Sequence, residues 1–203
     1  GLLLGVESEA RPQAGAARGA RLERMLDLVL ERGANDDGMM FNTLGDPKSG
    51  LSDGWGYNYV AYLCHDMALG RDHYRARVEH ALHGVAKPAY RDYAWEGTNI
   101  DGFADSIEGA LYLLNRVPVG AALEWVDGEM ARNVVRSSEP LGTAPLWGTM
   151  KLESNGVRTT IMHALMHTQG TIARPWRGDL RLGAAPIGNG AGAAVLLAAE
   201  APW

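Results

Sequence analysis

Residues 95–116 have the sequence WEGTNIDGFADSIEGALYLLNR, and this stretch decides the fold class. An Asp-Gly pair at Asp101 is followed by the apolar run Ala110–Leu114, which predicts a helix over Asp101–Asn115 that is apolar on much of its surface. Helices that are apolar nearly all round are usually buried, and helices with one apolar face cover them. The stretch therefore predicts an inner helix of a mainly α fold.

Similar phrases occur in two other places, about 50 residues apart, and we interpret them as an internal repeat. The three phrases are SDGW at Ser52–Trp55, IDGF at Ile100–Phe103 and SNGV at Ser154–Val157. Each precedes a predicted apolar helix, and these helices span 52–69, 101–115 and 157–169. More polar helices are predicted between them, over 71–86 and 120–137. Alternating inner and outer helices of this period make an α-solenoid or a closed toroid.

The segments on either side of these repeats differ from them in residue composition. An amphipathic helix is predicted over Arg21–Arg32 after a loop at 11–19, and residues 34–50, rich in Asn, Asp and Gly, predict a long structured loop. Beyond Gly170, short apolar runs flank Gly188-Asn189-Gly190, which predicts a C-terminal β segment. We therefore expect helical hairpins over 1–170 and a β segment over 171–203. Both ends look cut, so the chain is expected to be a fragment.

Composition excludes several classes of protein. The 203 residues are 46% hydrophobic and 21% charged with a net charge of -5, which excludes a disordered chain and gives no basic excess for nucleic acid or anionic membranes. No apolar run reaches the roughly 20 residues that span a bilayer. The single cysteine, Cys64, excludes an intrachain disulfide or a multi-thiolate zinc site. A sugar or another small neutral or cationic partner fits this composition, and no cofactor is predicted.

A family resemblance rests on LSDGWGYNY at 51–59, the preceding NDDGMMFNTL and the 95–116 stretch. Together they resemble the (α/α) toroid domains of polysaccharide lyases of heparinase or alginate-lyase type and of unsaturated-uronyl hydrolases. The resemblance implies inner helix starts around a sugar-binding cleft, a β-sandwich after the helices, an oligo- or polysaccharide partner, and a periplasmic or extracellular location. A full ring of a dozen helices needs nearly twice this length, so an incomplete toroid is expected.

Acidic residues follow one face of the 101–115 helix at spacings of three and four. This face carries Asp101, Asp105, Glu108, Tyr112 and Asn115. Glycosidic-bond hydrolysis needs one protonated and one ionised carboxyl, roughly 5 to 9.5 Å apart, and Asp101 paired with Asp53, Glu96 or Asp105 would supply them. The alternative is that Asp101 caps the helix and the acids that follow it are favoured only by the helix dipole.

Aromatic and amide side chains gather at the start of the 52–69 helix. Sugars bind to flat aromatic faces, so Trp55 with Tyr57 or Tyr59 is predicted to form a platform that Trp95 extends. Lyase chemistry instead needs a base and a group that neutralises a uronate, for which Tyr57, Asn58 and Arg158 are the right types. The alternative is that these aromatic residues are core residues.

His163 and His167 lie four residues apart, which is the spacing of a two-histidine metal pair. A metal site needs three or four ligands, and the sequence identifies no third one, so no metal site is predicted. His163 is instead expected to contact substrate or to belong to a plain polar helix face.

The sequence thus predicts a fragment of a carbohydrate-processing enzyme, a polysaccharide lyase or a glycoside hydrolase acting on acidic glycans. The predicted catalytic residues are Asp53, Tyr57, Asn58, Glu96, Asp101 and Asp105. The predicted substrate-binding residues are Trp55, Tyr59, Trp95, Glu108, Arg158 and His163. The alternative is a non-catalytic helical-hairpin module that binds a glycan or a protein partner, with the acids serving only as caps.

Overall fold

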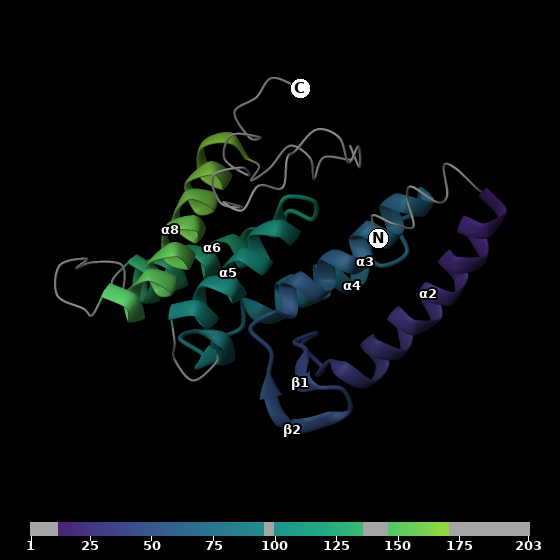
Figure 1. Ribbon diagram of the computed structural model, residues 1–203, viewed down its shortest axis with the longest axis horizontal. Helices are drawn as coiled ribbons and strands as arrows, with labels where there is room; N and C mark the ends of the chain where they lie inside the picture. The colour runs from purple at the N-terminus through teal and green to yellow at the C-terminus, as the bar shows by residue number, and fades with distance from the viewer. Residues whose placement is uncertain (1–11, 96–99, 136–145, 171–203) are drawn as a thin grey trace.

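The computed structural model describes residues 12–95, 100–135 and 146–170, and these residues are mainly helical (Figure 1). The α-helices are α2 (Pro12–Gly33), α3 (Trp55–Leu69), α4 (Arg75–Val85), α5 (Ile100–Leu114), α6 (Gly120–Glu129) and α8 (Leu146–Gln169). A short 3-10 helix, η1 (Pro88–Tyr90), and a π-helical turn, η3 (Met130–Val135), complete the helical part. The predicted mainly α fold is confirmed for this part, whereas the predicted C-terminal β segment lies outside the described residues.

The contacts between the helices show which of them are neighbours. α5 packs between α3 and α8, while α4 contacts α6, and α6 continues into η3. Figure 1 shows α2 and α8 toward opposite ends of the long axis, with α3 to α6 between them. Within the described ranges, no helix combines the length and the apolar character needed to cross a bilayer.

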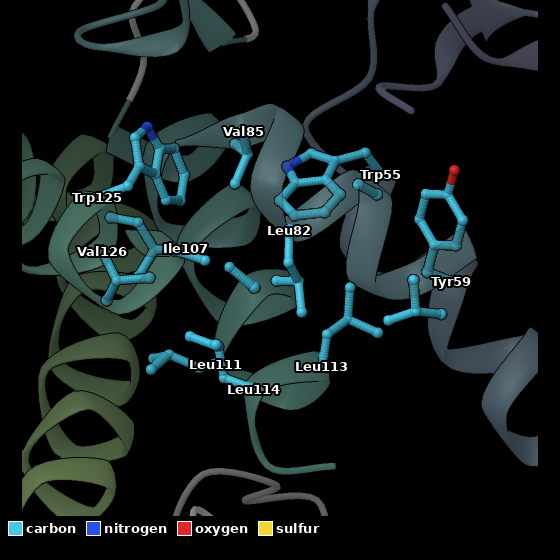
Figure 2. Close-up of a cluster of buried hydrophobic side chains, with 14 of the residues drawn as sticks. Trp55, Tyr59, Leu82, Val85, Ile107, Leu111, Leu113, Leu114, Trp125 and Val126 are labelled. Carbon is cyan, nitrogen blue, oxygen red and sulfur yellow. The ribbon is translucent and has the colours of Figure 1, made fainter. Parts of the chain in front are cut away.

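The hydrophobic core is centred on α5 (Figure 2). Ile107 and Leu111 of α5 are fully buried, and they face a cluster to which α3 adds Trp55, α4 adds Leu82 and α6 adds Val126. α4 buries only one side, because Glu79 and His83 are exposed while Val78 and Leu82 are not. This burial agrees with the prediction that residues 101–115 form an inner helix and that a helix with one apolar face packs over it.

A β-hairpin replaces most of the loop predicted over 34–50. β1 (Phe41–Thr43) pairs antiparallel with β2 (Asp46–Leu51), and Thr43 faces Asp46 across a two-residue turn. Gly45 in this turn has φ of +77°, a backbone conformation that glycine adopts without strain. Residues 41–51 therefore form two strands and a turn where a loop was predicted. The two strands are too polar to be recognised by an alternation of apolar and polar residues.

Two predicted helix starts are wrong. α2 begins at Pro12, so most of the predicted 11–19 loop is helical; proline is well tolerated in the first turn of a helix. α8 begins at Leu146, so the third repeat phrase, Ser154–Gly156, lies inside a helix and starts none. Only the phrases at the starts of α3 and α5 coincide with helix starts. Even at α3 the capping position is Gly54, and Asp53 accepts a hydrogen bond from the Gly54 amide at 2.7 Å instead.

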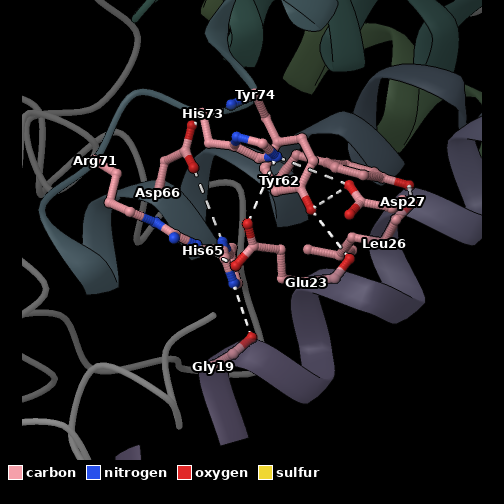
Figure 3. Close-up of polar contacts among 10 residues, drawn as sticks. All are labelled: Gly19, Glu23, Leu26, Asp27, Tyr62, His65, Asp66, Arg71, His73 and Tyr74. Atoms are coloured by element: carbon pink, nitrogen blue, oxygen red, sulfur yellow. Dashed lines mark hydrogen bonds and ion pairs between the residues drawn. The ribbon is translucent and has the colours of Figure 1, made fainter. Parts of the chain in front are cut away.

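Polar side chains join α2 to α3 and to the start of α4 (Figure 3). We call this region the α2 polar interface; it comprises Gly19, Glu23, Leu26, Asp27, Tyr62, His65, Asp66, Arg71, His73 and Tyr74. Tyr62 donates to the Leu26 carbonyl at 3.0 Å, and His65 Nε2 donates to the Gly19 carbonyl at 3.2 Å. Because these bonds end on backbone carbonyls, they fix the position of α2 along α3.

Candidate functional site

Glu108 is a buried carboxylate at the meeting point of three helices. It accepts hydrogen bonds from Tyr57 Oη of α3 at 2.8 Å, from Arg158 Nε of α8 at 2.7 Å and from Thr159 Oγ1 of α8 at 2.8 Å. Glu108 is only 1% exposed, so three donors satisfy a group that would otherwise be costly to bury. With Asp105 these residues form the Glu108 cluster: Tyr57, Asp105, Glu108, Arg158 and Thr159.

A close crossing of two helices positions this cluster. Gly56 of α3 lies against Gly109 of α5, and a Cβ placed on Gly56 would stand 2.4 Å from the Gly109 carbonyl carbon. Side chains at these positions cannot fit between the two backbones without moving them. Tyr57 directly follows the first glycine and Glu108 directly precedes the second, so the crossing brings the phenol to the carboxylate.

Asp105 lies one helical turn before Glu108 and is the partly exposed acid of the cluster. Its side chain is 32% exposed; its Oδ1 lies 3.4 Å from Tyr57 Oη and 3.7 Å from an Arg158 terminal nitrogen. Burial, followed by the negative charges of Glu108, Asp101 and Asp53, raises the pKa of Asp105 to about 6, although Arg158 acts in the opposite direction. A carboxyl with this pKa exchanges a proton near neutral pH.

Tyr57 acts as a hydrogen-bond donor in this arrangement. Burial and then the carboxylates of Glu108 and Asp105 raise the pKa of the Tyr57 phenol well above its ordinary value. A phenol has one proton, and the 2.8 Å contact to Glu108 uses it, which leaves the longer contact to Asp105 as the weaker one. The ring of Tyr57 also contacts that of Tyr112, with centroids 6.0 Å apart.

Arg158 is the counter-ion of the cluster. Burial opposes its positive charge, but the hydrogen bond and charge of Glu108 outweigh burial and raise the pKa of the guanidinium. The local charge is nevertheless acidic, because Asp53 and Asp101 also lie near enough to act on Asp105. Among the described residues, three carboxyl groups act on Asp105 and one guanidinium opposes them, which favours a neutral or cationic ligand over a polyanion.

The structure brings together six of the predicted site residues: Asp53, Tyr57, Asp101, Asp105, Glu108 and Arg158. Thr159 and Tyr112 complete the arrangement, although neither was a predicted site residue. Tyr112 belongs to the acidic face of α5, which was a usable signal. Thr159 is recognisable only once α8 is known to pack against α5.

Three predicted sugar-binding residues are core residues instead. Trp55 is fully buried and donates to Ser106 Oγ at 2.9 Å, and Tyr59 is 2% exposed and donates to the Gly38 carbonyl. Trp95 is also fully buried and packs against Tyr93 with ring centroids 4.7 Å apart. A sugar platform needs an exposed ring face, so the burial of these rings corrects the platform prediction.

The remaining predicted residues lie apart from the cluster or outside the described chain. Asn58 follows Tyr57 on α3 and its side chain is exposed. His163 contacts Asp127 of α6 rather than the Glu108 cluster, with Nε2 2.6 Å from Oδ1. Glu96 falls in the segment 96–99, outside the described residues.

Comparison of the chain with protein-family models, with curated proteins and with solved structures gives no match.

Proposed function

We propose that this chain is the helical domain of a carbohydrate-processing enzyme that hydrolyses glycosidic bonds, with Asp105 as the general acid. The observation that carries the proposal is a partly exposed carboxyl with a pKa of about 6 beside a buried, fully hydrogen-bonded Glu108. Hydrolysis of a glycosidic bond requires a carboxylic acid that is still protonated when it meets the leaving-group oxygen. A raised pKa is the means by which proteins keep such an acid protonated.

The second carboxylate in this proposal is Asp53. Its Oδ1 is oriented by the Gly54 amide at 2.7 Å, and its charge acts on Asp105 from a different element, the segment before α3. A substrate bond held between that segment and α5 would have an acid on one side and a carboxylate on the other, as hydrolysis requires. Asp101 lies on α5 itself, one turn before Asp105, and acts through its charge.

Glu108 has a positioning role in this proposal. Its burial and three hydrogen bonds leave it unable to approach a substrate, whereas they hold Tyr57 and Arg158 next to Asp105. The negative charge of Glu108 also helps to raise the pKa of Asp105. Loss of Glu108 would therefore alter the proton affinity of Asp105 without removing a group that touches the substrate.

The acidic surroundings bear on the class of substrate. Four carboxyl groups and one guanidinium repel a polyuronate, so the proposed substrate is a neutral or amino-sugar glycan instead of the acidic glycan expected from the resemblance. Elimination from a uronate is the second candidate, supported by the closeness of Tyr57 and Arg158. The raised pKa of Tyr57 disfavours the tyrosinate that would serve as its base.

The (α/α) toroid is part of the same proposal. What supports it is the order of contacts: α3, α5 and α8 follow one another in one layer, and α4 and α6 follow one another in a second layer. Inner and outer rings of helices would have this order.

The test is an incubation of the 203-residue chain with neutral, amino-sugar and uronate polysaccharides, with reducing ends and ultraviolet absorbance recorded together. Reducing ends without absorbance are expected from a neutral or amino-sugar glycan. Asp105→Asn should lower the rate at least 100-fold. Asp72→Asn, which removes an exposed acid from the segment between α3 and α4, should leave the rate unchanged.

Two results would overturn the proposal. Absorbance that rises with the reducing ends and disappears in Tyr57→Phe would establish elimination. A folded sample that cleaves nothing in the panel would instead support the non-catalytic module that binds a glycan or a protein partner.

A further inference from the structure

A second polar cluster lies away from Asp105, where α6 and α8 meet. Asp127 of α6 accepts contacts from two histidines of α8 on the same oxygen: His163 Nε2 lies 2.6 Å and His167 Nε2 lies 2.7 Å from Asp127 Oδ1. One ligand atom from each of the three residues lies within 4.8 Å of the other two. The spacing of the two histidines indicated a pair of ligands without a third, and Asp127 supplies the third from 36 residues before His163.

The local geometry is that of side chains converging on one point. The histidines are one helical turn apart, and their rings meet edge to face with centroids 4.7 Å apart. Both direct Nε2 toward Asp127 Oδ1, so two nitrogen ligand atoms and one oxygen ligand atom gather at one place where α6 meets α8.

We propose that Asp127, His163 and His167 form a binding site for a divalent first-row transition-metal ion of the zinc class. Two imidazoles and a carboxylate are a donor set that Zn²⁺ uses with a fourth position left for water or a ligand. Imidazole nitrogen is a poor ligand for Ca²⁺ and Mg²⁺, which prefer oxygen donors.

Binding of the ion requires the ligand atoms to move apart from their present contacts. Ligand atoms around a tetrahedral Zn²⁺ stand roughly 3.3 Å apart when each bond is about 2.0 to 2.1 Å long. The two nitrogen–oxygen distances must therefore increase by about 0.7 Å from their present 2.6 and 2.7 Å. The Asp127 side chain is 44% exposed, as is that of His167, so a rotation of the carboxylate meets little resistance.

The position of the site gives the ion a consequence for the fold. Thr159, His163 and His167 follow one another at intervals of four residues, so they form one stripe along α8. Thr159 binds Glu108 of α5, and the two histidines meet α6. An ion bound by Asp127 and the two histidines would therefore join α8 to α6. This link would lie about one helical turn, roughly 6 Å along α8, from the contact of Thr159 with α5.

The test is titration of the chelator-treated chain with Zn²⁺ in a calorimeter, with Co²⁺ as a spectroscopic probe. One ion per chain is expected, with Co²⁺ giving the visible absorption of a low-coordinate nitrogen and oxygen site. Asp127→Asn and His163→Ala should each weaken Zn²⁺ binding at least tenfold. Asp127→Asn keeps a hydrogen-bond acceptor of the same shape, so loss of binding in this variant is separable from loss of folding.

The matched control is the double variant His80→Ala with His83→Ala, which removes two exposed histidines of α4 and should bind Zn²⁺ as the original chain does. The proposal is overturned if a folded sample binds no ion in a one-to-one ratio, or if affinity survives both Asp127→Asn and His163→Ala. Since metal binding is measured without substrate, either outcome is independent of the glycosidase proposal.

Discussion

The α2 polar interface and the Glu108 cluster both join helices through polar side chains, but they do so with different partners. At the α2 polar interface, the buried side chains of Tyr62 and His65 bond backbone carbonyls of α2, and the buried Asp66 carboxylate accepts the Tyr74 amide at 2.6 Å (Figure 3). The charged pair of this interface, Arg71 with Glu23, lies at its partly exposed side. In the Glu108 cluster, side chains bond other side chains, and a partly exposed acid is raised to a pKa of about 6. Backbone partners fix a fold, whereas interacting charged groups supply chemistry and lower stability unless each is satisfied.

The largest expected effect comes from removing the counter-ion of the cluster. Arg158→Met leaves the buried Glu108 without its only described cationic partner, which should lower the free energy of unfolding by about 3 kcal/mol. Urea denaturation at pH 7 measures this, with Arg77→Met, on the exposed side of α4, as the control. A loss below about 1 kcal/mol would show that Tyr57 and Thr159 suffice to stabilise Glu108.

The next effect concerns the helix crossing that forms the cluster. Gly56→Ala places a methyl group 2.4 Å from the Gly109 backbone, so α3 and α5 must separate, at a cost of about 2 to 3 kcal/mol. Gly120→Ala is the control, because a Cβ there meets nothing within 4 Å. Thermal unfolding of both variants checks the prediction, and equal melting temperatures would contradict it.

Asp105→Asn should stabilise the protein at neutral pH. The folded pKa of about 6 exceeds the ordinary 3.8, so the native state holds the proton more tightly and stability falls as pH rises from about 4 to about 6. The neutral amide avoids this loss and should gain about 1 to 2 kcal/mol at pH 7, after allowance for solvent screening, and little at pH 4. Urea denaturation across this range tests it, with Asp72→Asn as control; an unchanged pH slope would contradict the assignment.

The smallest effect is expected at the α2 polar interface. Tyr62→Phe removes one neutral hydrogen bond to the Leu26 carbonyl and should cost about 1 kcal/mol. Tyr62→Phe should not change the pH dependence of stability that is due to Asp105. Tyr57→Phe should change it, because the Tyr57 hydroxyl contacts Glu108 and Asp105. Carboxyl NMR titration of Asp105 separates the two variants, and a shifted pKa in Tyr62→Phe would mean that the regions are coupled.

The sequence allowed the prediction of local features that depend on one helix. The spacing of Asp101, Asp105 and Glu108 placed three acids on one face of α5, and the apolar run after them identified a buried helix. Partners supplied by other helices were harder to predict, because nothing in the spacing of Asp127 or Thr159 indicates which helix they meet. The aromatic residues at the start of α3 were misinterpreted, since Trp55 and Tyr59 bury rings in the core and satisfy their polar atoms internally.

The close approach of Gly56 and Gly109 also has a consequence for which residues related proteins would retain together. Each glycine is required by the other helix's backbone, and each adjoins a residue of the Glu108 cluster, so the four positions Gly56, Tyr57, Glu108 and Gly109 are expected to be inherited as a unit. A descendant that gains a side chain at either glycine must separate α3 from α5, and the phenol–carboxylate contact is then lost with the crossing. A relative that keeps both glycines can keep the contact, so the glycine pair would help to tell relatives with the same site from relatives that share only the helices.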